Sequence, residues 1–377
     1  EEERMLQTMV RDFADRELMP RALEVDEREE FSWENWRGMA QLGLTGIGID
    51  PKYGGSGGGY RNMVIVADEV SRGDASAGVT LISHLSLGTT TIYRFANEEQ
   101  RERLVPSLAS GKGVAAWALT EPGGGSDAAA LRTTATKREG TYFLNGSKMF
   151  ITNAAEAESM VVFATQDPAL GHKGISAFVV PGNAPGLGVN HLHGKMGMRG
   201  SSTCEVVLQD TPVPEENRLG EEGRGFRCAM EILDSSRIII AAQCVGIGQA
   251  ALEAGVRYAQ QREAFGRPIA QHQAIQFMLA DMATEVCAAR VVTMNAATLK
   301  DNGLPFVDQA SMAKLMASEM CVKVSSQALQ VHGGYGYFKD AAVERIFRDA
   351  RVTTIYEGTS EIQRLVIARQ VLAKYPL

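Results

Sequence analysis

The stretch TYFLNGSKMFIT, residues 141–152, decides how the chain divides into parts. It consists of two extended runs around Asn145-Gly146, a dipeptide that favours the tight turn of a β-hairpin. Further short strands are predicted at SMVVFA (159–164), ISAFVV (175–180) and TCEVVL (203–208). Prolines are frequent in this section, which suits short strands and loops better than long helices.

Helical patterns flank this β section on both sides. Residues 1–110 combine charged amphipathic segments with one glycine-rich loop, YGGSGGG (53–59). No GK[ST] follows that loop, so we interpret it as a surface loop rather than a phosphate cradle. The segment RIIIAAQCVGIGQAALEAGV (237–256) predicts a buried helix that is too polar and too short to span a bilayer. The chain therefore predicts a helical lobe, a small β lobe and a second helical lobe.

Size, charge and cysteine content limit the classes of function. A chain of 377 residues exceeds one ordinary core. The formal charge of −7 argues against a nucleic-acid binder and against an anionic-membrane binder. Five cysteines without a CxxC spacing indicate a reduced intracellular protein. The chain begins EEERM, which leaves a removed targeting segment open.

Most simple kinds of site have little support in the sequence. His191 and His193 could share one strand face, but no third ligand lies near them, so no metal site is predicted. There is no nucleophile elbow, and no GxGxxG lies between a strand and a helix.

The stretch TTIYEGTSEIQRLVIA (353–368) raises a different question about Glu357. This acid precedes a glycine, just before a predicted helix with a hydroxyl residue as its N-cap. An acid here could simply favour the positive end of the helix. The glycine indicates a backbone bend that holds the acid toward another group.

Three other stretches are not explained by packing. AWALTEPGGGSDA (116–128) contains three glycines that either let backbone N–H groups approach a ligand or form an ordinary turn. QREAFGRPIAQHQ (261–273) places two arginines around an aromatic residue and a glycine. QVHGGYGY (330–337) ends a long helix with one glycine more than a helix stop needs.

These stretches resemble the signature segments of the flavin-dependent acyl-CoA dehydrogenases. The resemblance covers essentially the whole chain in order, and includes MFIT (149–152), LDSSR (233–237) and IYEGTSE (355–361). AWALTEPG, Gln243 and IYEGTSEIQRLVIA are most similar to the short-chain (butyryl-CoA) branch. The resemblance implies a mainly α fold with a central β domain. Its expected parts are an N-terminal all-α domain (1–114), a middle β-barrel domain (115–225) and a C-terminal four-helix bundle (226–377).

The resemblance also implies a reaction. Such enzymes convert an acyl-CoA thioester into its trans-2-enoyl-CoA, with removal of the α proton by a base and transfer of a β hydride to FAD. Glu357 matches the base, and burial beside Tyr356 is expected to raise its pKa towards neutrality. Gly358 leaves room for the thioester, and Ser126, Asp234 and Arg237 match substrate contacts.

The resemblance also implies which residues of this chain contact FAD. Trp117, Leu119 and Thr120 are expected along the isoalloxazine, Gly125 and Ser126 near the pyrophosphate, and Phe150, Ile151 and Thr152 on the other side. Phe150 departs from the tryptophan common in the family and offers less stacking area. Thr359 and Glu361 match contacts within the flavin's own subunit. Contacts with the adenine-diphosphate half of FAD in a neighbouring subunit are expected from Arg262, Phe265, Gln273, Gln330, Val331, Gly333 and Gly334.

Helical geometry adds one inference about Gln243. It shares a helix face with Ser236, the position at which some family members carry their base, so Gln243 either floors the acyl pocket or is bonded inside the bundle. The shared flavin sites imply an obligate oligomer, by analogy a homotetramer. Electron-transferring flavoprotein is the expected acceptor. Branched-chain or cyclic substrates, or an oxidase on the same fold, remain open. The expected location is the cytoplasm in a prokaryote or the mitochondrial matrix in a eukaryote.

Overall fold

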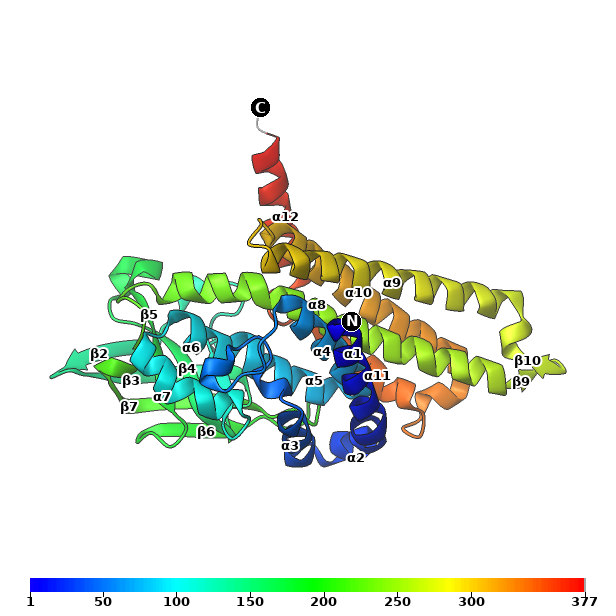
Figure 1. Ribbon diagram of the computed structural model, residues 1–377, viewed down its shortest axis with the longest axis horizontal. Helices are drawn as coiled ribbons and strands as arrows, with labels where there is room; N and C mark the ends of the chain where they lie inside the picture. The colour runs from blue at the N-terminus through cyan, green and yellow to red at the C-terminus, as the bar shows by residue number, and fades with distance from the viewer. Residues whose placement is uncertain (376–377) are drawn as a thin grey trace.

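The computed structural model describes residues 1–375, so the last two residues of the predicted C-terminal bundle lie outside it. The fold class is confirmed: helices occupy both ends of the chain, and a β-sheet lies between them. The sheet forms one end of an elongated body, and three long helices extend towards the other end (Figure 1).

The N-terminal part is helical because its apolar residues recur at helical spacing and because side chains cap the helices. Asn97 and Gln100, for example, form a capping box at the start of α7. The glycine-rich loop 53–59 lies largely at the surface, as predicted. The α-helices are α1 (Glu2–Phe13), α2 (Met19–Arg28), α3 (Trp33–Gln41), α4 (Tyr60–Gly73), α5 (Ala75–Ile82), α6 (Thr90–Phe95) and α7 (Glu98–Ala109).

The middle part forms one sheet of eight strands. Its order is β6-β7-β3-β2-β4-β5-β8, and β1 pairs with β4 in parallel. Side chains on both faces of β4 and β5 are almost all buried, which explains their continuous apolar runs. The strands are β1 (Val114–Ala118), β2 (Thr134–Arg138), β3 (Thr141–Thr152), β4 (Ala157–Thr165), β5 (Ile175–Pro181), β6 (Leu187–His191), β7 (Thr203–Pro214) and β8 (Arg218–Leu219).

The predicted hairpin at Asn145-Gly146 is wrong. Residues 141–152 form a single strand, β3, and this dipeptide makes a bulge at which the register with β7 shifts. The Asn145 side chain donates to Oδ1 of Asp210 at 2.9 Å and accepts from the Asp210 backbone N–H at 2.9 Å. The turn lies earlier, where Glu139 and Gly140, both at positive φ, connect β2 to β3.

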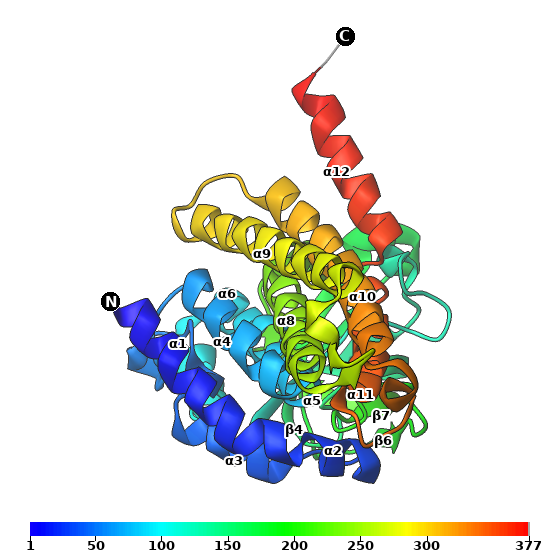
Figure 2. The same cartoon turned by 90° about the vertical axis from the view of Figure 1, so that its right-hand side faces the viewer.

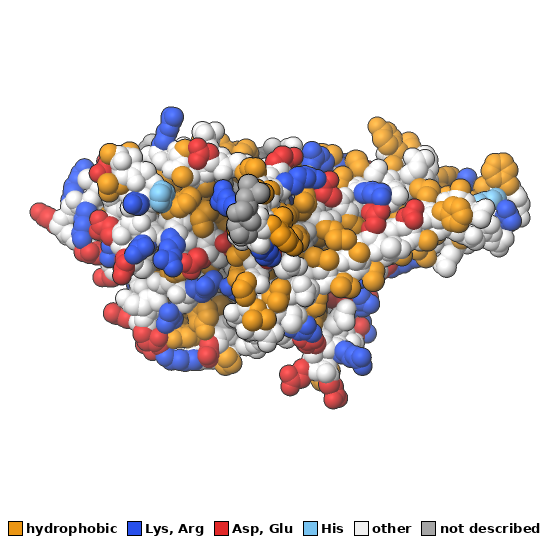
Figure 3. Space-filling view, turned by 90° about the horizontal axis from the view of Figure 1, so that it is seen from above, with side chains coloured by type: hydrophobic (Ala, Val, Ile, Leu, Met, Phe, Trp, Pro, Cys, Tyr) orange, Lys and Arg blue, Asp and Glu red, His pale blue; other side chains and the backbone are white. Residues whose placement is uncertain are grey.

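The C-terminal part consists mainly of long helices. They are α8 (Gly225–Gln261), α9 (Gln273–Asp301), α10 (Val307–His332), the shorter α11 (Ala342–Ala350) and α12 (Ser360–Lys374). A short pair of strands, β9 (Glu263–Ala264) and β10 (Arg267–Pro268), joins α8 to α9. Helix α12 projects away from the body, as two perpendicular views show (Figures 1 and 2). Seen from above, the body is broad at the sheet end and narrows towards the far ends of the long helices (Figure 3).

Helix α8 is longer than the predicted segment 237–256. Among the described residues it is the one helix that is long and apolar enough to cross a membrane, which corrects the prediction that this segment is too short and too polar. However, 78% of its most apolar window is buried inside the protein, as expected for the central helix of a helical core. The predicted buried helix is therefore confirmed.

Candidate active site

Glu357 lies at a bend just before α12. Its φ is 48° and that of Gly358 is 93°, so two consecutive residues occupy left-handed conformations. The φ of 93° favours glycine at 358, and a Cβ atom there would lie 2.6 Å from Nε2 of Gln363 and displace that side chain. Thr359 caps α12 by accepting a hydrogen bond from the N–H of Ile362 at 3.3 Å. The predicted bend and cap are confirmed.

Two side chains that the sequence interpretation missed hold this bend. Nζ of Lys314, which is fully buried in α10, donates to the carbonyl of Gly358 at 2.8 Å. Nε2 of Gln363 donates to the same carbonyl at 3.0 Å and to that of Glu357 at 3.4 Å. A signal for Lys314 was available, because it lies among alanines on the buried face of α10, where a charge needs a partner.

Glu357 is half-buried as a residue, but its carboxyl group lies inside the protein. Its Oε2 atom is buried and has no hydrogen-bond partner among residues 1–375. Burial raises the pKa of Glu357 to about 7, and the Ser236 hydroxyl and the positive charges of Lys314 and Arg237 oppose that rise. A carboxyl group with this pKa can accept a proton at neutral pH and can also return it.

Helix α8 supplies the other side of the Glu357 environment. Arg237 is buried and donates to Oδ1 of Asp234 at 2.7 Å, while its Nε is buried without a partner among the described side chains. Burial lowers the pKa of Arg237 and raises that of Asp234. Two turns after Ser236, fully buried Gln243 accepts a hydrogen bond from the hydroxyl of Tyr356 at 2.6 Å.

The β part contributes a second group of predicted residues. Trp117 and Leu119 belong to a buried core cluster against which Met230 and Leu233 of α8 pack, one to two turns before Ser236. The indole Nε1 of Trp117 is buried without a partner in the described structure. The structure therefore brings the predicted flavin segment and the Glu357 environment to neighbouring turns of α8.

The remaining predicted flavin residues of this part lie around an open surface. The Phe150 side chain is 67% exposed and its φ is 60°, whereas Ile151 is buried and Thr152 is half-buried. Thr120 is half-buried, and its carbonyl accepts from the N–H of Met149 at 2.9 Å, which joins the two segments. Gly125 and Ser126 are exposed, and a Cβ atom on Gly125 would meet nothing within 4 Å.

A buried ion pair lies beneath these two segments and was also missed. Lys148, fully buried in β3, donates to Oε1 of Glu121 at 2.8 Å and to the carbonyl of Leu119 at 3.3 Å. Glu121 also accepts from the N–H groups of Arg132 and Thr133 at 2.6 and 3.0 Å. Burial tends to raise the pKa of Glu121, but the Lys148 charge and these hydrogen bonds outweigh it, so the pKa is lowered.

The predicted adenine-side residues lie far from Glu357. From Ser236 to Arg262 is 26 residues along α8, or about 39 Å at the helical rise. Phe265 is 96% exposed at the β9–β10 turn, and the guanidinium of Arg262 lies 5.4 Å from the ring centre of Tyr335. Exposed residues of this distal tip include Arg262, Gln273, Gln330, Gly333 and Gly334, whereas Val331 is buried.

His191 and His193 are exposed, and their rings stack with centroids 5.8 Å apart. Within residues 1–375, no group of three or more His, Cys, Asp or Glu side chains is placed to hold a metal ion.

Family models match three consecutive parts of the chain. They are the acyl-CoA dehydrogenase N-terminal domain (residues 1–112), middle domain (116–211) and C-terminal domain (223–372). The chain belongs to the acyl-CoA dehydrogenase family. It is therefore an FAD-dependent oxidoreductase.

Related proteins agree over nearly the full length. The chain is 47% identical to human short-chain specific acyl-CoA dehydrogenase over 100% of this chain and 91% of the relative. It is 46% identical to acryloyl-CoA reductase (NADH) of Anaerotignum propionicum, over 99% and 95%. Butyryl-CoA dehydrogenase of Megasphaera elsdenii has a TM-score of 0.96 at 40% identity, covering 98% of both chains.

A further solved structure, of the electron transferring flavoprotein of Acidaminococcus fermentans, contains a similar chain. The TM-score is 0.97 at 43% identity, and the match covers 99% of this chain and 98% of that one.

The residues of this acyl-CoA dehydrogenase fit FAD. A flat polar ring would satisfy the orphaned Trp117 indole N–H and cover the exposed ring of Phe150. Open space at Gly125 admits a bulky group, and the hydroxyls of Thr120 and Thr152 lie on the two joined segments. When bound there, FAD supplies the hydride acceptor that no side chain can provide.

Proposed function

We propose that the protein oxidises a short-chain acyl-CoA thioester to trans-2-enoyl-CoA. The observation that carries this proposal is the Glu357 carboxyl group, which has a buried oxygen and a pKa of about 7. As a carboxylate, Glu357 takes the proton from the α carbon. FAD held by the segments that contain Trp117 and Phe150 would supply the acceptor for the hydride of the β carbon. The electron pair of the broken α C–H bond forms the new C–C double bond, and the electron pair of the β C–H bond leaves with the hydride.

The other residues bind and orient the substrate. We propose that Asp234 and Arg237 contact CoA, and that Ser126, Tyr356 and Gly358 line the site around the thioester. Gln243 closes the acyl pocket behind Tyr356. Support comes from the burial of Arg237 with an unpaired Nε and from the Tyr356–Gln243 hydrogen bond.

We assign the flavin ring to the segments that contain Trp117, Leu119, Thr120, Gly125, Ser126, Phe150, Ile151 and Thr152, with Thr359 and Glu361 near the same FAD. The distal tip, with Arg262, Phe265, Gln273, Gln330, Val331, Gly333 and Gly334, would bind the adenine-diphosphate half of a neighbouring subunit's FAD. Support for this comes from the distance of about 39 Å along α8 between the tip and the Glu357 environment. A homotetramer is the proposed assembly.

We propose electron-transferring flavoprotein as the acceptor, an intracellular location, and no stable membrane insertion or nucleic-acid binding. A domain division at 114/115 and 225/226 is also proposed. Support comes from the connections between α7 and β1 (110–113) and between β8 and α8 (220–224), each of which ends one residue before the first residue of the next element, Val114 or Gly225.

The decisive experiment is anaerobic bleaching of the bound flavin by a panel of straight, branched and cyclic acyl-CoAs. We expect butyryl-CoA to bleach the wild-type flavin fastest. The Glu357→Gln variant is expected to keep its yellow flavin but to lose bleaching by orders of magnitude. Near-normal bleaching in this variant would reject Glu357 as the base, and peroxide release in air would identify an oxidase.

A second candidate is the reverse reaction, reduction of a 2-enoyl-CoA. The 46% identity to an acryloyl-CoA reductase favours it, and a Glu357 pKa of about 7 suits proton donation as well as acceptance. Chemically reduced enzyme mixed with acryloyl-CoA or crotonyl-CoA tests this direction. Rapid reoxidation together with slow bleaching by saturated acyl-CoAs would favour the reductase.

A further inference from the structure

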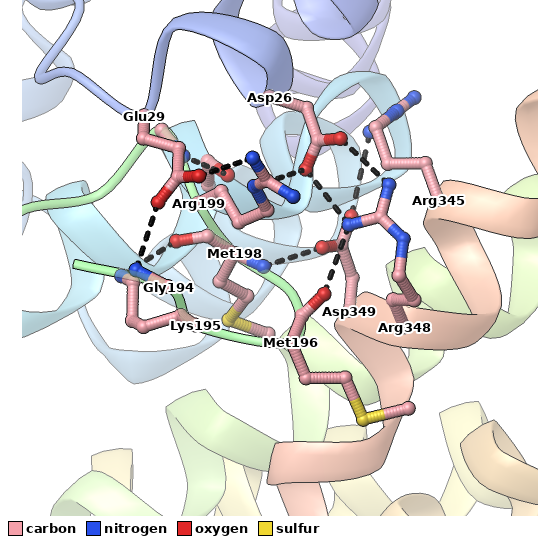
Figure 4. Close-up of polar contacts among 12 residues, drawn as sticks. Asp26, Glu29, Gly194, Lys195, Met196, Met198, Arg199, Arg345, Arg348 and Asp349 are labelled. Carbon is pink, nitrogen blue, oxygen red and sulfur yellow. Dashed lines mark hydrogen bonds and ion pairs between the residues drawn. The ribbon is translucent and has the colours of Figure 1, made fainter. Parts of the chain in front are cut away.

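The segment between β6 and β7, residues 194–201, is clamped among helices of both helical parts (Figure 4). We call it the clamped loop. On the α2 side, the N–H of Gly194 donates to Oε2 of Glu29 at 3.0 Å, and Arg199 forms an ion pair with Glu29. On the α5 side, the N–H of Gly200 donates to the Ser76 hydroxyl at 3.2 Å.

Helix α11 holds the middle of the clamped loop by its backbone. Arg348 donates to the carbonyl of Met196 at 2.9 Å, and it also pairs with Asp26 at 2.6 Å. Oδ1 of Asp349 accepts the N–H of Met198 at 2.5 Å. Asp349 is buried, and its carboxylate lies 3.5 Å from Nη1 of Arg345. These contacts leave little freedom for the loop to shift relative to α11.

Met198 continues the connection towards the site. Its φ is 49°, an uncommon conformation for a residue other than glycine, and its side chain is buried. Nε2 of Gln243 donates to its sulfur at 3.9 Å, and Oε1 of Gln243 accepts the Tyr356 hydroxyl at 2.6 Å. The clamped loop thus reaches the Glu357 segment twice: through Asp349, eight residues before Glu357, and through Gln243 and Tyr356.

These connections matter because the two reacting groups come from different parts of the chain. The base lies between two helices of the C-terminal part, whereas the segments assigned to the flavin belong to the β part. Contacts between the parts help to fix their separation, and a misplacement of about 1 Å can cost about 100-fold in rate.

We propose that Met198 and Asp349 are positioning residues that hold the Glu357 segment at a fixed distance from the flavin-bearing strands. This inference rests on the function proposed above. Neither residue touches substrate; they act through Tyr356 and the backbone of α11.

The test uses full-length, FAD-loaded variants and the rate of anaerobic bleaching at saturating butyryl-CoA. For Asp349→Ala we expect a rate about 10- to 100-fold lower, with FAD affinity within about threefold of wild type. Asp349→Asn keeps an oxygen that can accept the Met198 N–H, so its rate is expected within about threefold. Met198→Leu keeps the apolar volume but removes the sulfur, and we expect about a three- to tenfold loss.

Glu29→Gln is the matched control, because it alters the α2 side of the same loop without touching the route to Tyr356. Its rate is expected within about twofold of wild type. The proposal is overturned if Asp349→Ala, Asp349→Asn and Met198→Leu all fold and bleach at the wild-type rate. It is also overturned if Asp349→Ala does not fold and the other two variants bleach at the wild-type rate. The proposal is also overturned if the bleaching rate of Asp349→Asn or of Glu29→Gln falls as much as that of Asp349→Ala. If the proposed function is wrong, no acyl-CoA in the panel will bleach the flavin of the wild-type enzyme.

Discussion

The hydroxyl of Tyr356 donates a 2.6 Å hydrogen bond to Oε1 of Gln243, which joins the residue before the proposed base to the middle of α8. Gln243 is fully buried and also donates to the carbonyl of Ala75 at 3.3 Å. The interpretation that Gln243 is bonded inside the helical core is confirmed. The interpretation that it also closes the acyl pocket stays a prediction.

Gln243→Gly is expected to lengthen the acyl pocket. Removing the side chain opens space behind Tyr356, so the preference for butyryl-CoA over octanoyl-CoA is expected to fall about tenfold. The ratio of kcat/KM values for a series of acyl-CoAs measures this change. Gln249→Gly, a glutamine on the same helix that pairs with Glu253 instead, is the control for helix destabilisation. An unchanged ratio in Gln243→Gly would contradict the pocket role.

The pH dependence of bleaching follows from Glu357. Its carboxyl group must be deprotonated to accept the α proton, so the rate is expected to rise with pH through about 7. A pH series of bleaching rates at saturating butyryl-CoA measures this dependence. The range from pH 6 to pH 8 brackets this pKa of about 7. A bleaching rate that does not change over that range would argue against Glu357 as the titrating group.

The same pKa shift predicts how stability changes with pH. The folded pKa of about 7 exceeds the ordinary value of 4.5, so the folded state binds more protons and stability is lost as pH rises between those values. Glu357→Gln does not titrate. We expect its Tm to exceed that of wild type by a few degrees above pH 7 and the difference to shrink towards pH 4.5. Thermal unfolding across this range is the measurement, and a constant difference would contradict it.

The Lys148–Glu121 pair is expected to support flavin binding through the two segments it joins. Lys148→Met leaves a buried carboxylate without its cation, which costs about 3–5 kcal/mol and is expected to weaken FAD binding. The double variant Lys148→Met/Glu121→Gln removes both charges and keeps an oxygen for the backbone N–H groups, so it is expected to recover much of the Tm.

Thermal unfolding and FAD titration of apoenzyme measure both effects. The exposed pair of Lys137 and Glu215 on the same sheet provides the control, and Lys137→Met is expected to change neither. Unaltered FAD affinity in folded Lys148→Met would show that the pair supports the sheet alone.

Phe150→Trp tests the departure from the family pattern. A larger ring at this exposed position is expected to cover more of the flavin, tighten FAD binding severalfold and reduce quenching of flavin fluorescence by iodide. Fluorescence quenching and FAD titration are the measurements. Equal accessibility in both proteins would place the residue away from the ring.

Helix α12 provides the test of the assembly. Leu365 and Leu372 are exposed on this projecting helix, a composition typical of a surface that a partner covers. Replacing both with serine is expected to convert the proposed tetramer into smaller species and to lower FAD occupancy, as measured by light scattering and absorbance. A wild-type protein that is a stable FAD-loaded monomer would overturn the homotetramer.

The parts of the fold and site that follow local rules could be predicted from the sequence. The Glu357-Gly358 bend, the Thr359 cap and the short strands 159–164 and 175–180 depend on conformational preferences of neighbouring residues. The Asn145-Gly146 hairpin failed because pairing with Asp210, 65 residues away, converts a local turn signal into a bulge.

The same limit explains the missed residues. Lys314 and Lys148 matter because of partners 44 and 27 residues away in the sequence, and no local pattern specifies such pairs. The length of α8 was underestimated because its ends are less apolar than its centre. Only the packed structure shows that the helix continues to the distal tip.

The distal tip has a consequence for biosynthesis. A newly made chain carries a nearly bare phenylalanine at residue 265, with Tyr335, Tyr337 and Phe338 exposed beside the same turn region. In the proposed assembly a neighbouring subunit and its FAD cover these rings, so a folded chain that has not yet assembled is expected to associate with other proteins through them. The soluble fraction of the expressed enzyme is then expected to increase with the riboflavin supplied during expression.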